Sequence, residues 1–287
     1  MRVTKKAYAK VNLALNVFDK TNSGYHQLDS LVVTVDLFDK VTLISRRDKK
    51  VNLKVAGFTG YANTFIKEKD NAYKAALAYM NECECNGVDI ILKKNIPLSS
   101  GMGGSSTCAS ATLLAMEELY GCGANLEKIA NSLGSDTAYL LKGGYARLKG
   151  RGEQITPLNI EKNLQMLAVF PSSGIDTTEC FKQFDKMPKH ANNSDIEALI
   201  NSFSQEEILY SECKNALTES ACAINGELKE CIDYAKSLSP KACFMTGSGS
   251  TVIVMFDSKE LLLWAQEKFY NEGFKCKILN TYIPERD

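Results

Sequence analysis

Residues 96–107 read IPLSSGMGGSST and lead directly into an apolar helical pattern from Ala109 to Leu119. Glycines let the backbone curl and turn several N–H groups toward one anion, and the start of the following helix adds the positive end of its dipole. The stretch therefore predicts a phosphate-binding loop. Taken alone, it is equally compatible with a flexible turn and a serine cap, so the rest of the chain has to separate the two.

The composition is that of an ordinary folded protein, with 45% hydrophobic and 24% charged residues in a chain of 287. The 34 basic and 34 acidic side chains cancel, so the charge balance favours neither nucleic acid nor an anionic membrane as a partner. The N-terminus lacks the apolar segment of a signal peptide, and no apolar run has the length of a membrane span. We expect a cytoplasmic monomer or homodimer that acts on a small molecule.

Ten cysteines raise the question of disulfides or a zinc site. None of them is paired in a CxxC spacing, and the chain has only two histidines, His26 and His190. A thiolate metal site is therefore not expected. The cysteines are better interpreted as reduced and mostly buried thiols.

The hydrophobic pattern predicts an α+β protein. Strands are expected at residues 7–17 and 28–44 as an opening hairpin, and a helix over 72–83 precedes a strand at 88–92 that delivers the chain to the glycine loop. Further strands are expected at 164–170, 242–246, 251–256 and 275–282, with a helix from Ser258 that Asp257 and Glu260 would cap as a pair. A boundary near Pro157 divides the chain into domains 1–157 and 158–287.

The glycine loop does not match two common nucleotide motifs. It lacks the GxxxxGK[ST] pattern of P-loop proteins, and neither histidine begins the His-Arg-Asp triplet of protein kinases. Hydroxyls at 105–107 could instead cap the helix and ligate a phosphate-bound Mg²⁺. Phosphoryl transfer also needs cations and acids, and Lys10 and Asp136 are candidates, although each alone is more simply a solvated charge or a helix cap.

Five segments, taken in order, resemble the GHMP small-molecule kinase superfamily over nearly the whole chain. They are AKVNL at 9–13, GYHQLDS at 24–30, the glycine loop with its leading Pro97, GSD at 134–136, and TGSG at 246–249. The resemblance implies a two-domain GHMP kinase fold, with an N-terminal domain like domain 2 of ribosomal protein S5 and a ferredoxin-like C-terminal domain. The GYHxLxS segment is most similar to the branch that phosphorylates the 2-hydroxyl of 4-diphosphocytidyl-2-C-methyl-D-erythritol in non-mevalonate isoprenoid biosynthesis.

The resemblance also implies roles for individual residues, with ATP and Mg²⁺ as cofactors. Asp136 would orient or deprotonate the acceptor hydroxyl, and Lys10 would neutralise charge and form an ion pair with Asp136. ATP would contact Asn71, Pro97, Ser99, Ser100, Gly101, Met102, Gly103, Gly104, Ser105, Ser106 and Thr107, and Ser106 or Thr107 would reach the metal. The CDP-linked polyol would contact Asn12, Tyr25, His26, Thr177, Phe181, Gly247, Ser248 and Gly249, with the cytosine held by Tyr25 and His26.

Simpler interpretations exist for several of these residues. Tyr25 and His26 could finish a hairpin turn, Asn71 could belong to a helix cap, and Phe181 could be a core residue. The chain also departs from the usual family pattern at Ser105, Cys108 and 138–139.

Two other functions stay open. One is a GHMP kinase for homoserine or a mevalonate-type acid, whose carboxylate would need a cation such as Lys93, Lys94 or Arg147. The other is a catalytically silent sensor with the same fold.

Overall fold

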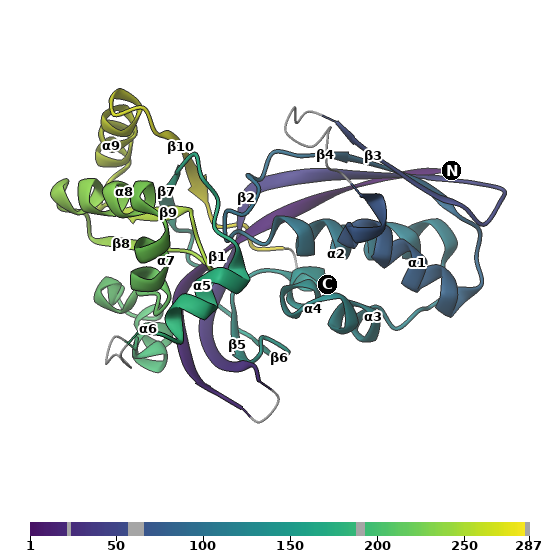
Figure 1. Ribbon diagram of the computed structural model, residues 1–287, viewed down its shortest axis with the longest axis horizontal. Coiled ribbons are helices and arrows are strands. Elements are labelled where there is room, and N and C mark those ends of the chain that lie inside the picture. The colour runs from purple at the N-terminus through teal and green to yellow at the C-terminus, as the bar shows by residue number, and fades with distance from the viewer. Residues whose placement is uncertain (22–23, 57–65, 188–192, 285–287) are drawn as a thin grey trace. The chain divides into compact units, whose positions relative to one another are not determined.

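The computed structural model describes residues 1–21, 24–56, 66–187 and 193–284 (Figure 1). His190 lies outside these residues. The chain divides into two compact units that each combine separate segments: 1–9, 37–96 and 103–143 form the first, and 10–36, 97–102 and 144–287 form the second. The expected division of the sequence at Pro157 stays a prediction.

Two long strands open the chain and contribute residues to both units. They are β1 (Arg2–Lys20) and β2 (His26–Ser45), and they pair with each other as the expected hairpin. Each is longer than its apolar pattern indicates, and the added ends of β1 include exposed residues such as Arg2 and Phe18.

The first unit packs helices beside a short set of strands. Strand β4 (Val88–Lys93) lies between β3 (Val51–Ala56), to which it is parallel, and the C-terminal half of β2, to which it is antiparallel. Figure 1 shows α1 (Asn71–Cys83), α2 (Gly104–Tyr120), α3 (Leu126–Leu133) and α4 (Ser135–Lys142) gathered beside these strands. Helix α2 is buried on most sides, as its high content of Ala and Leu predicts.

The second unit contains two sets of strands. The start of β2 pairs antiparallel with β5 (Ala146–Gly150), which pairs with β6 (Gln154–Pro157). A separate antiparallel sheet has the order β10-β7-β9-β8. Its strands are β7 (Gln165–Phe170), β8 (Ala242–Met245), β9 (Val252–Met255) and β10 (Lys275–Asn280). The helices of this unit are α5 (Thr177–Phe184), α6 (Ile196–Ser202), α7 (Thr218–Ile224), α8 (Gly226–Ser237) and α9 (Lys259–Asn271).

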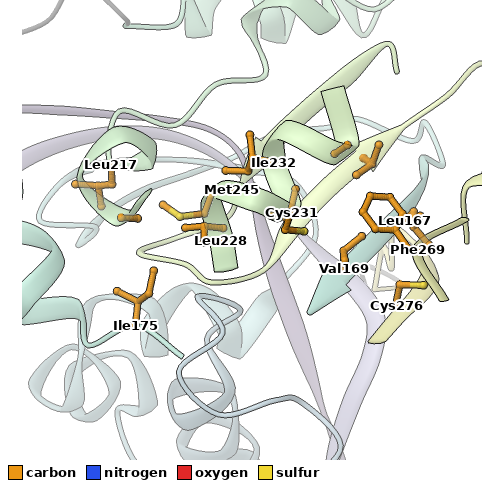
Figure 2. Close-up of a cluster of buried hydrophobic side chains, with 14 of the residues drawn as sticks. Leu167, Val169, Ile175, Leu217, Leu228, Cys231, Ile232, Met245, Phe269 and Cys276 are labelled. Atoms are coloured by element: carbon orange, nitrogen blue, oxygen red, sulfur yellow. The ribbon is translucent and has the colours of Figure 1, made fainter. Parts of the chain in front are cut away.

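A hydrophobic core joins the four-stranded sheet to its helices. Figure 2 shows Leu167 and Val169 of β7 in this cluster, with Leu228 and Ile232 from α8 and Phe269 from α9. The cluster also includes Ile175, at the start of the segment that leads into α5. The core therefore holds Ile175, whose backbone N–H binds the glycine loop at Ser99.

The cap of α9 corrects one expectation. The side chain of Ser258 accepts a hydrogen bond from the Leu261 N–H and is the N-cap, so the expected role of Asp257 was wrong. Asp257 lies one residue too early and forms an ion pair with Lys241, 3.3 Å away.

Two further observations concern the whole chain. All ten cysteines are free thiols, and five of them are buried. Among the helices in the described residues, none has both the length and the apolar character that crossing a bilayer requires.

Candidate active site

The first part of the glycine loop, residues 97–102, is held in the second unit by backbone hydrogen bonds from three directions. The N–H of Lys10 on β1 donates to the Met102 carbonyl at 3.0 Å. Ile175 N–H donates to the carbonyl of Ser99, and Thr251 N–H donates to the carbonyl of Ser100, each at 3.3 Å. The loop is therefore built into the fold and is not a freely moving turn, which favours the phosphate-loop interpretation.

Gly101 lies directly against the second glycine segment, 246–249. A Cβ at Gly101 would stand 2.1 Å from the Thr246 carbonyl oxygen, and a Cβ at Gly247 would stand 2.5 Å from the Gly101 oxygen. Both glycines also have positive φ, 74° and 57°. The two backbones touch at a distance that only glycine permits.

Asn215 supports this contact, and nothing in the sequence pattern singled it out. Its side-chain amide donates to the carbonyls of Met245 and Gly247 at 2.7 and 2.8 Å. In a sequence, Asn in a loop usually indicates no more than a turn. The role of Asn215 can therefore be recognised only in the fold, which brings together segments about 30 positions apart.

Lys10 and Asn12 lie on the same face of β1, as the period of the strand predicts. Lys10 is only 4% exposed, and its Nζ donates to Asn12 Oδ1 at 2.5 Å. Asn12 donates through its side chain to Ser30 Oγ at 2.8 Å and through its backbone N–H to Thr246 Oγ1 at 2.9 Å. The lysine ammonium is thus held in one place beside the 246–249 segment.

His26 is the centre of an aromatic cluster at the start of β2. Its ring stacks on Phe181 of α5 with centroids 5.4 Å apart, and Phe184 meets it edge-on. The ring Nδ1 lies 2.6 Å from the Phe18 carbonyl oxygen, and Nε2 lies 3.0 Å from Asp185. Phe181 also packs against the core of the second unit, as the simpler interpretation expects, and its contact with substrate stays a prediction.

Asp185 is a residue that the sequence did not single out. The Lys20 ammonium, which forms an ion pair and hydrogen bond with it, and the nearby His26 hold the pKa of this carboxyl below its usual range. An ionised Asp185 therefore orients the His26 ring through Nε2.

The other residues expected to contact the acceptor are also in the second unit. Tyr25 is 59% exposed, and the Arg151 guanidinium lies 5.0 Å from its ring centroid. Thr177, the first residue of α5, shares a hydrogen bond of 2.8 Å with Ser248. The acceptor-side residues thus form two pairs, His26 with Phe181 and Thr177 with Ser248, together with the exposed ring of Tyr25.

The rest of the loop, from Gly103, belongs to the first unit and begins α2. Gly103 is the N-cap with φ 73° and no side-chain cap bond is formed, so the expectation that a hydroxyl caps this helix was wrong. The Thr107 hydroxyl is buried and donates to the Tyr8 carbonyl at 2.8 Å. The first turn of α2 therefore presents its N–H groups without a capping side chain, as an anion site requires.

Asp136 lies in the first turn of α4, close in the fold to the start of α2. A Cβ at Gly134 would stand 3.5 Å from Thr137 Oγ1 and 4.0 Å from Ser106 Oγ, so these two hydroxyls flank one point. Ser110 ties the helices together by donating to the carbonyls of Ser106 and Thr137. The hydroxyls of Ser106 and Thr137 therefore lie near one point at an edge of the first unit, and Asp136 directly precedes Thr137 in α4.

This edge fits a phosphate-bound Mg²⁺. Thr137 Oγ1 is buried and has no hydrogen-bond partner among the described residues, and Mg²⁺ prefers oxygen ligands, most of them from phosphate and water. No group of three or more His, Cys, Asp or Glu suited to a metal occurs in the described chain.

Asn71, expected near the adenine, is the first residue of α1. The N-cap of that helix is Asp70, whose carboxylate accepts the Ala72 N–H at 2.8 Å. Burial raises the pKa of Asp70.

A cavity of about 780 Å³ lies in the second unit, with walls from the end of β1, the 213–220 segment and the end of α5. It borders the His26 cluster through His26, Phe184 and Asp185. Neither glycine segment lines it, and of the expected site residues it includes only His26.

Comparison with known proteins identifies the family of the chain. Residues 70–145 match the model for the GHMP kinases N terminal domain, and residues 194–275 match that for GHMP kinases C terminal. The chain is 35% identical over 286 residues to the 4-diphosphocytidyl-2-C-methyl-D-erythritol kinase of Clostridium perfringens strain 13, covering 97% of this chain and 96% of the relative. The enzyme of the same name from Thermodesulfovibrio yellowstonii is 31% identical, with 98% of each chain covered.

Solved structures give the same result for the fold. A crystal structure of 4-(cytidine 5'-diphospho)-2C-methyl-D-erythritol kinase has a TM-score of 0.80 at 26% identity, over 97% of this chain and 99% of the other. Homoserine kinase from Cytophaga hutchinsonii shares the fold with a TM-score of 0.77 at 17% identity, over 98% of this chain and 95% of the other. With two glycine segments in contact, a buried lysine beside them and full-length relatives, the chain belongs to the GHMP kinase family of ATP-dependent small-molecule kinases.

Proposed function

We propose that this kinase transfers the γ-phosphoryl group of ATP to the 2-hydroxyl of 4-diphosphocytidyl-2-C-methyl-D-erythritol, a step of non-mevalonate isoprenoid biosynthesis. The observation that carries the proposal is the stack of Phe181 on His26, fixed by Asp185. Recognition of a single base uses aromatic faces beside polar groups, and this cluster offers both. The curated relatives named above carry this activity in their names.

The backbone around His26 would read the base more directly than its ring nitrogens. Both nitrogens already lie within hydrogen-bond distance of Phe18 O and Asp185, so the ring serves as a positioned surface. Tyr25 would supply a second, exposed aromatic face. The pair formed by Thr177 and Ser248 would contact the polyol or diphosphate.

Catalysis in this proposal depends on position and charge. Asp136 orients the acceptor hydroxyl and accepts its proton, and Lys10 neutralises charge on that oxygen and on the migrating phosphoryl group. Amide groups from Gly101 to Thr107 would hold the phosphates of ATP.

Mg²⁺, when bound, would supply charge neutralisation at the β- and γ-phosphates. Ser106 is the better candidate ligand of the two hydroxyls considered, because it is half-buried whereas Thr107 is buried with its hydroxyl against the Tyr8 carbonyl. The hydroxyl of Thr137, which has no hydrogen-bond partner among the described residues, would be a second protein ligand.

We also propose that the enzyme works in a reducing cytoplasm, which its free thiols support.

The runner-up substrates, homoserine or a mevalonate-type acid, would need a cation for their carboxylate. Arg147 already binds Asp29 at 2.8 Å and Glu197 at 2.5 Å, and Lys94 is buried in an ion pair with Asp39. Two of the three candidate cations therefore have acidic partners in the fold, which leaves only Lys93 and weakens this alternative.

The test is a coupled ATP-consumption assay with the CDP-linked polyol, homoserine and mevalonate as separate acceptors. We expect turnover with the first alone, competitive inhibition by CDP, and a loss of roughly 10² to 10⁴-fold in kcat for Asp136→Asn with ADP binding retained. Lys10→Ala should behave in the same way. Turnover of another acceptor in preference would overturn the substrate assignment, and ADP binding without ATP consumption for any acceptor would favour the silent sensor.

A further inference from the structure

A buried ion pair in the first unit has no part in the reaction just described. Asp39, on β2, is fully buried, and Lys94, one residue after β4, is 6% exposed. Their side chains form a salt bridge. The Cys108 thiol lies 3.4 Å from both the Lys94 ammonium and the Asp39 carboxylate.

The two charged groups hold the chain on both sides of the glycine loop. Asp39 Oδ1 accepts the backbone N–H groups of Asn95 at 2.6 Å and Ile96 at 2.9 Å, immediately before the loop. Lys94 Nζ donates to the carbonyl of Gly104, the first residue of α2, at 3.2 Å. One ion pair thus fixes the two ends of residues 97–103.

The start of α2 is in van der Waals contact with the residues before the loop, in addition to the hydrogen bond from Lys94. A Cβ at Gly104 would stand 3.2 Å from Ile96 Cγ2 and 3.6 Å from Lys94 Nζ. The start of α2 therefore packs directly on the residues that precede the loop. A small change in the pair would move the first turn of α2 relative to the strand before it.

Stability alone is a poor reason for such a pair. Removing two charges from water costs much of what their attraction gains, and apolar replacements of buried ion pairs are often neutral or stabilising. Fixing a geometry is the better-attested use of buried charge, and here both groups also form hydrogen bonds with the backbone at the two ends of residues 97–103.

We propose that Asp39 and Lys94 are positioning residues that set the spacing of the phosphate-binding loop, and with it the affinity for the phosphates of ATP. This inference rests on the proposed use of the loop as an ATP site. It adds two residues that act through the loop backbone and do not touch the nucleotide.

The variant that tests it is Asp39→Asn with Lys94→Met, which removes both charges at nearly constant volume and leaves no single buried charge. The matched control is Arg46→Met with Asp89→Asn. It removes the ion pair between Arg46 and Asp89, whose atoms are 2.7 Å apart and which lies at the opposite end of β4. Calorimetric titration with ADP and Mg²⁺ gives the dissociation constant, and steady-state kinetics give KM for each substrate.

We expect the dissociation constant for ADP and the KM for ATP to rise about tenfold or more in the test variant. This is the change in affinity that the loss of one hydrogen bond to a charged group typically causes. The KM for the alcohol and both constants of the control should stay within about twofold of wild type. A folded test variant with wild-type nucleotide affinity would overturn the inference. Wild-type protein that binds no nucleotide would overturn the proposed function instead.

Hydrogen exchange of the wild-type protein provides a second test that needs no variant. Mass spectrometry over residues 95–104 should show slow exchange at the amides of Asn95 and Ile96 before any nucleotide is added, because Asp39 already binds them. Rapid exchange that becomes slow only with ADP would mean that the ligand, and not the ion pair, orders the loop.

Discussion

At the scale of single residues, the contact between Gly101 and the 246–249 segment gives a prediction with a clear control. Gly101 and Gly123 have nearly the same backbone, with φ of 74° and 69°. A Cβ at Gly101 would meet the Thr246 carbonyl oxygen at 2.1 Å, whereas a Cβ at Gly123 would meet nothing within 4 Å. Gly123→Ala should therefore cost only the left-handed backbone strain, about 1 kcal/mol of unfolding free energy.

Gly101→Ala must in addition separate two packed backbones. We expect a larger loss of unfolding free energy, roughly 3 kcal/mol or more, or a shifted loop with a KM for ATP raised about tenfold or more. Urea denaturation and steady-state kinetics of the two variants check this. Equal effects of the two substitutions on stability and on KM would show that the close approach does not matter.

Some of these residue contacts could be predicted from sequence and others could not. The shared face of Lys10 and Asn12 follows from the two-residue period of a strand. The hydrogen bond from Asn12 to Thr246 joins positions 234 apart, and no local pattern carries that information. The Thr107 hydroxyl, one of those expected to cap α2, instead binds the carbonyl of Tyr8, which is distant in sequence. Asn215 was missed because its contact with Gly247 is also non-local.

At the scale of elements, Glu117 in the last turn of α2 joins that helix to its neighbours. Its carboxylate accepts the Tyr79 hydroxyl of α1 at 2.8 Å and the N–H groups of Gly123 at 2.9 Å and Ala124 at 3.3 Å. Burial by itself raises the pKa of Glu117, but the hydrogen bonds from the Gly123 N–H and the other two donors outweigh it and leave the pKa below its usual range. The ionised form is therefore stabilised in the folded protein.

A depressed folded-state pKa contributes stability above the unfolded-state value, about 4.3 for Glu, and this contribution is lost as the pH falls through the folded-state value. Glu117→Gln should lower the unfolding free energy by about 1–2 kcal/mol near neutral pH, and the difference from wild type should shrink below about pH 4. Urea denaturation across this range measures it. Glu118→Gln, which removes only an exposed ion pair with Lys5, should change stability by well under about 1 kcal/mol. A Glu117→Gln deficit that persists unchanged into acid would contradict the assignment.

The elements themselves were largely predictable. Helices α1 and α2 and strands β4, β7 and β9 occur where periodicity indicates, since each has a continuous buried face. Their ends were less predictable, because the ends of β1 are fixed by pairing with β2 and not by burial, and the N-cap of α9 falls one residue later than expected.

At the scale of the whole molecule, the expected residues are divided between the two units, and the ATP loop contributes to both, with residues 97–102 in the second and 103–107 in the first. Those assigned to the acceptor, from Asn12 to Gly249, all lie in the second unit, whereas Asn71, Ser106 and Asp136 lie in the first. No hydrophobic pattern shows this division, because both units are assembled from separate segments. The assignment of segments to a common site came from the family resemblance and not from periodicity.

Phe181 lies in the second unit and Asn71 in the first, so we expect that binding of the two substrates can be weakened independently through these two residues. Phe181→Ala removes the ring that stacks on His26, and base stacking on an aromatic ring contributes about 1–3 kcal/mol. We expect the KM for the CDP-linked polyol to rise roughly tenfold or more while ADP affinity measured by calorimetry stays unchanged. Asn71→Ala should show the reverse, a higher KM for ATP and an unchanged affinity for CDP.

The control for lost packing is Phe256→Ala. Phe256 packs on the same core cluster as Phe181 but makes its ring contact with Trp264 and not with His26. It should lower the thermal midpoint about as much as Phe181→Ala without changing either KM by more than about twofold. If Phe181→Ala altered the affinity for both substrates, or if Phe256→Ala raised the KM for the polyol equally, the ring of Phe181 would be a core residue only. The base-binding role of the His26 cluster would then be lost.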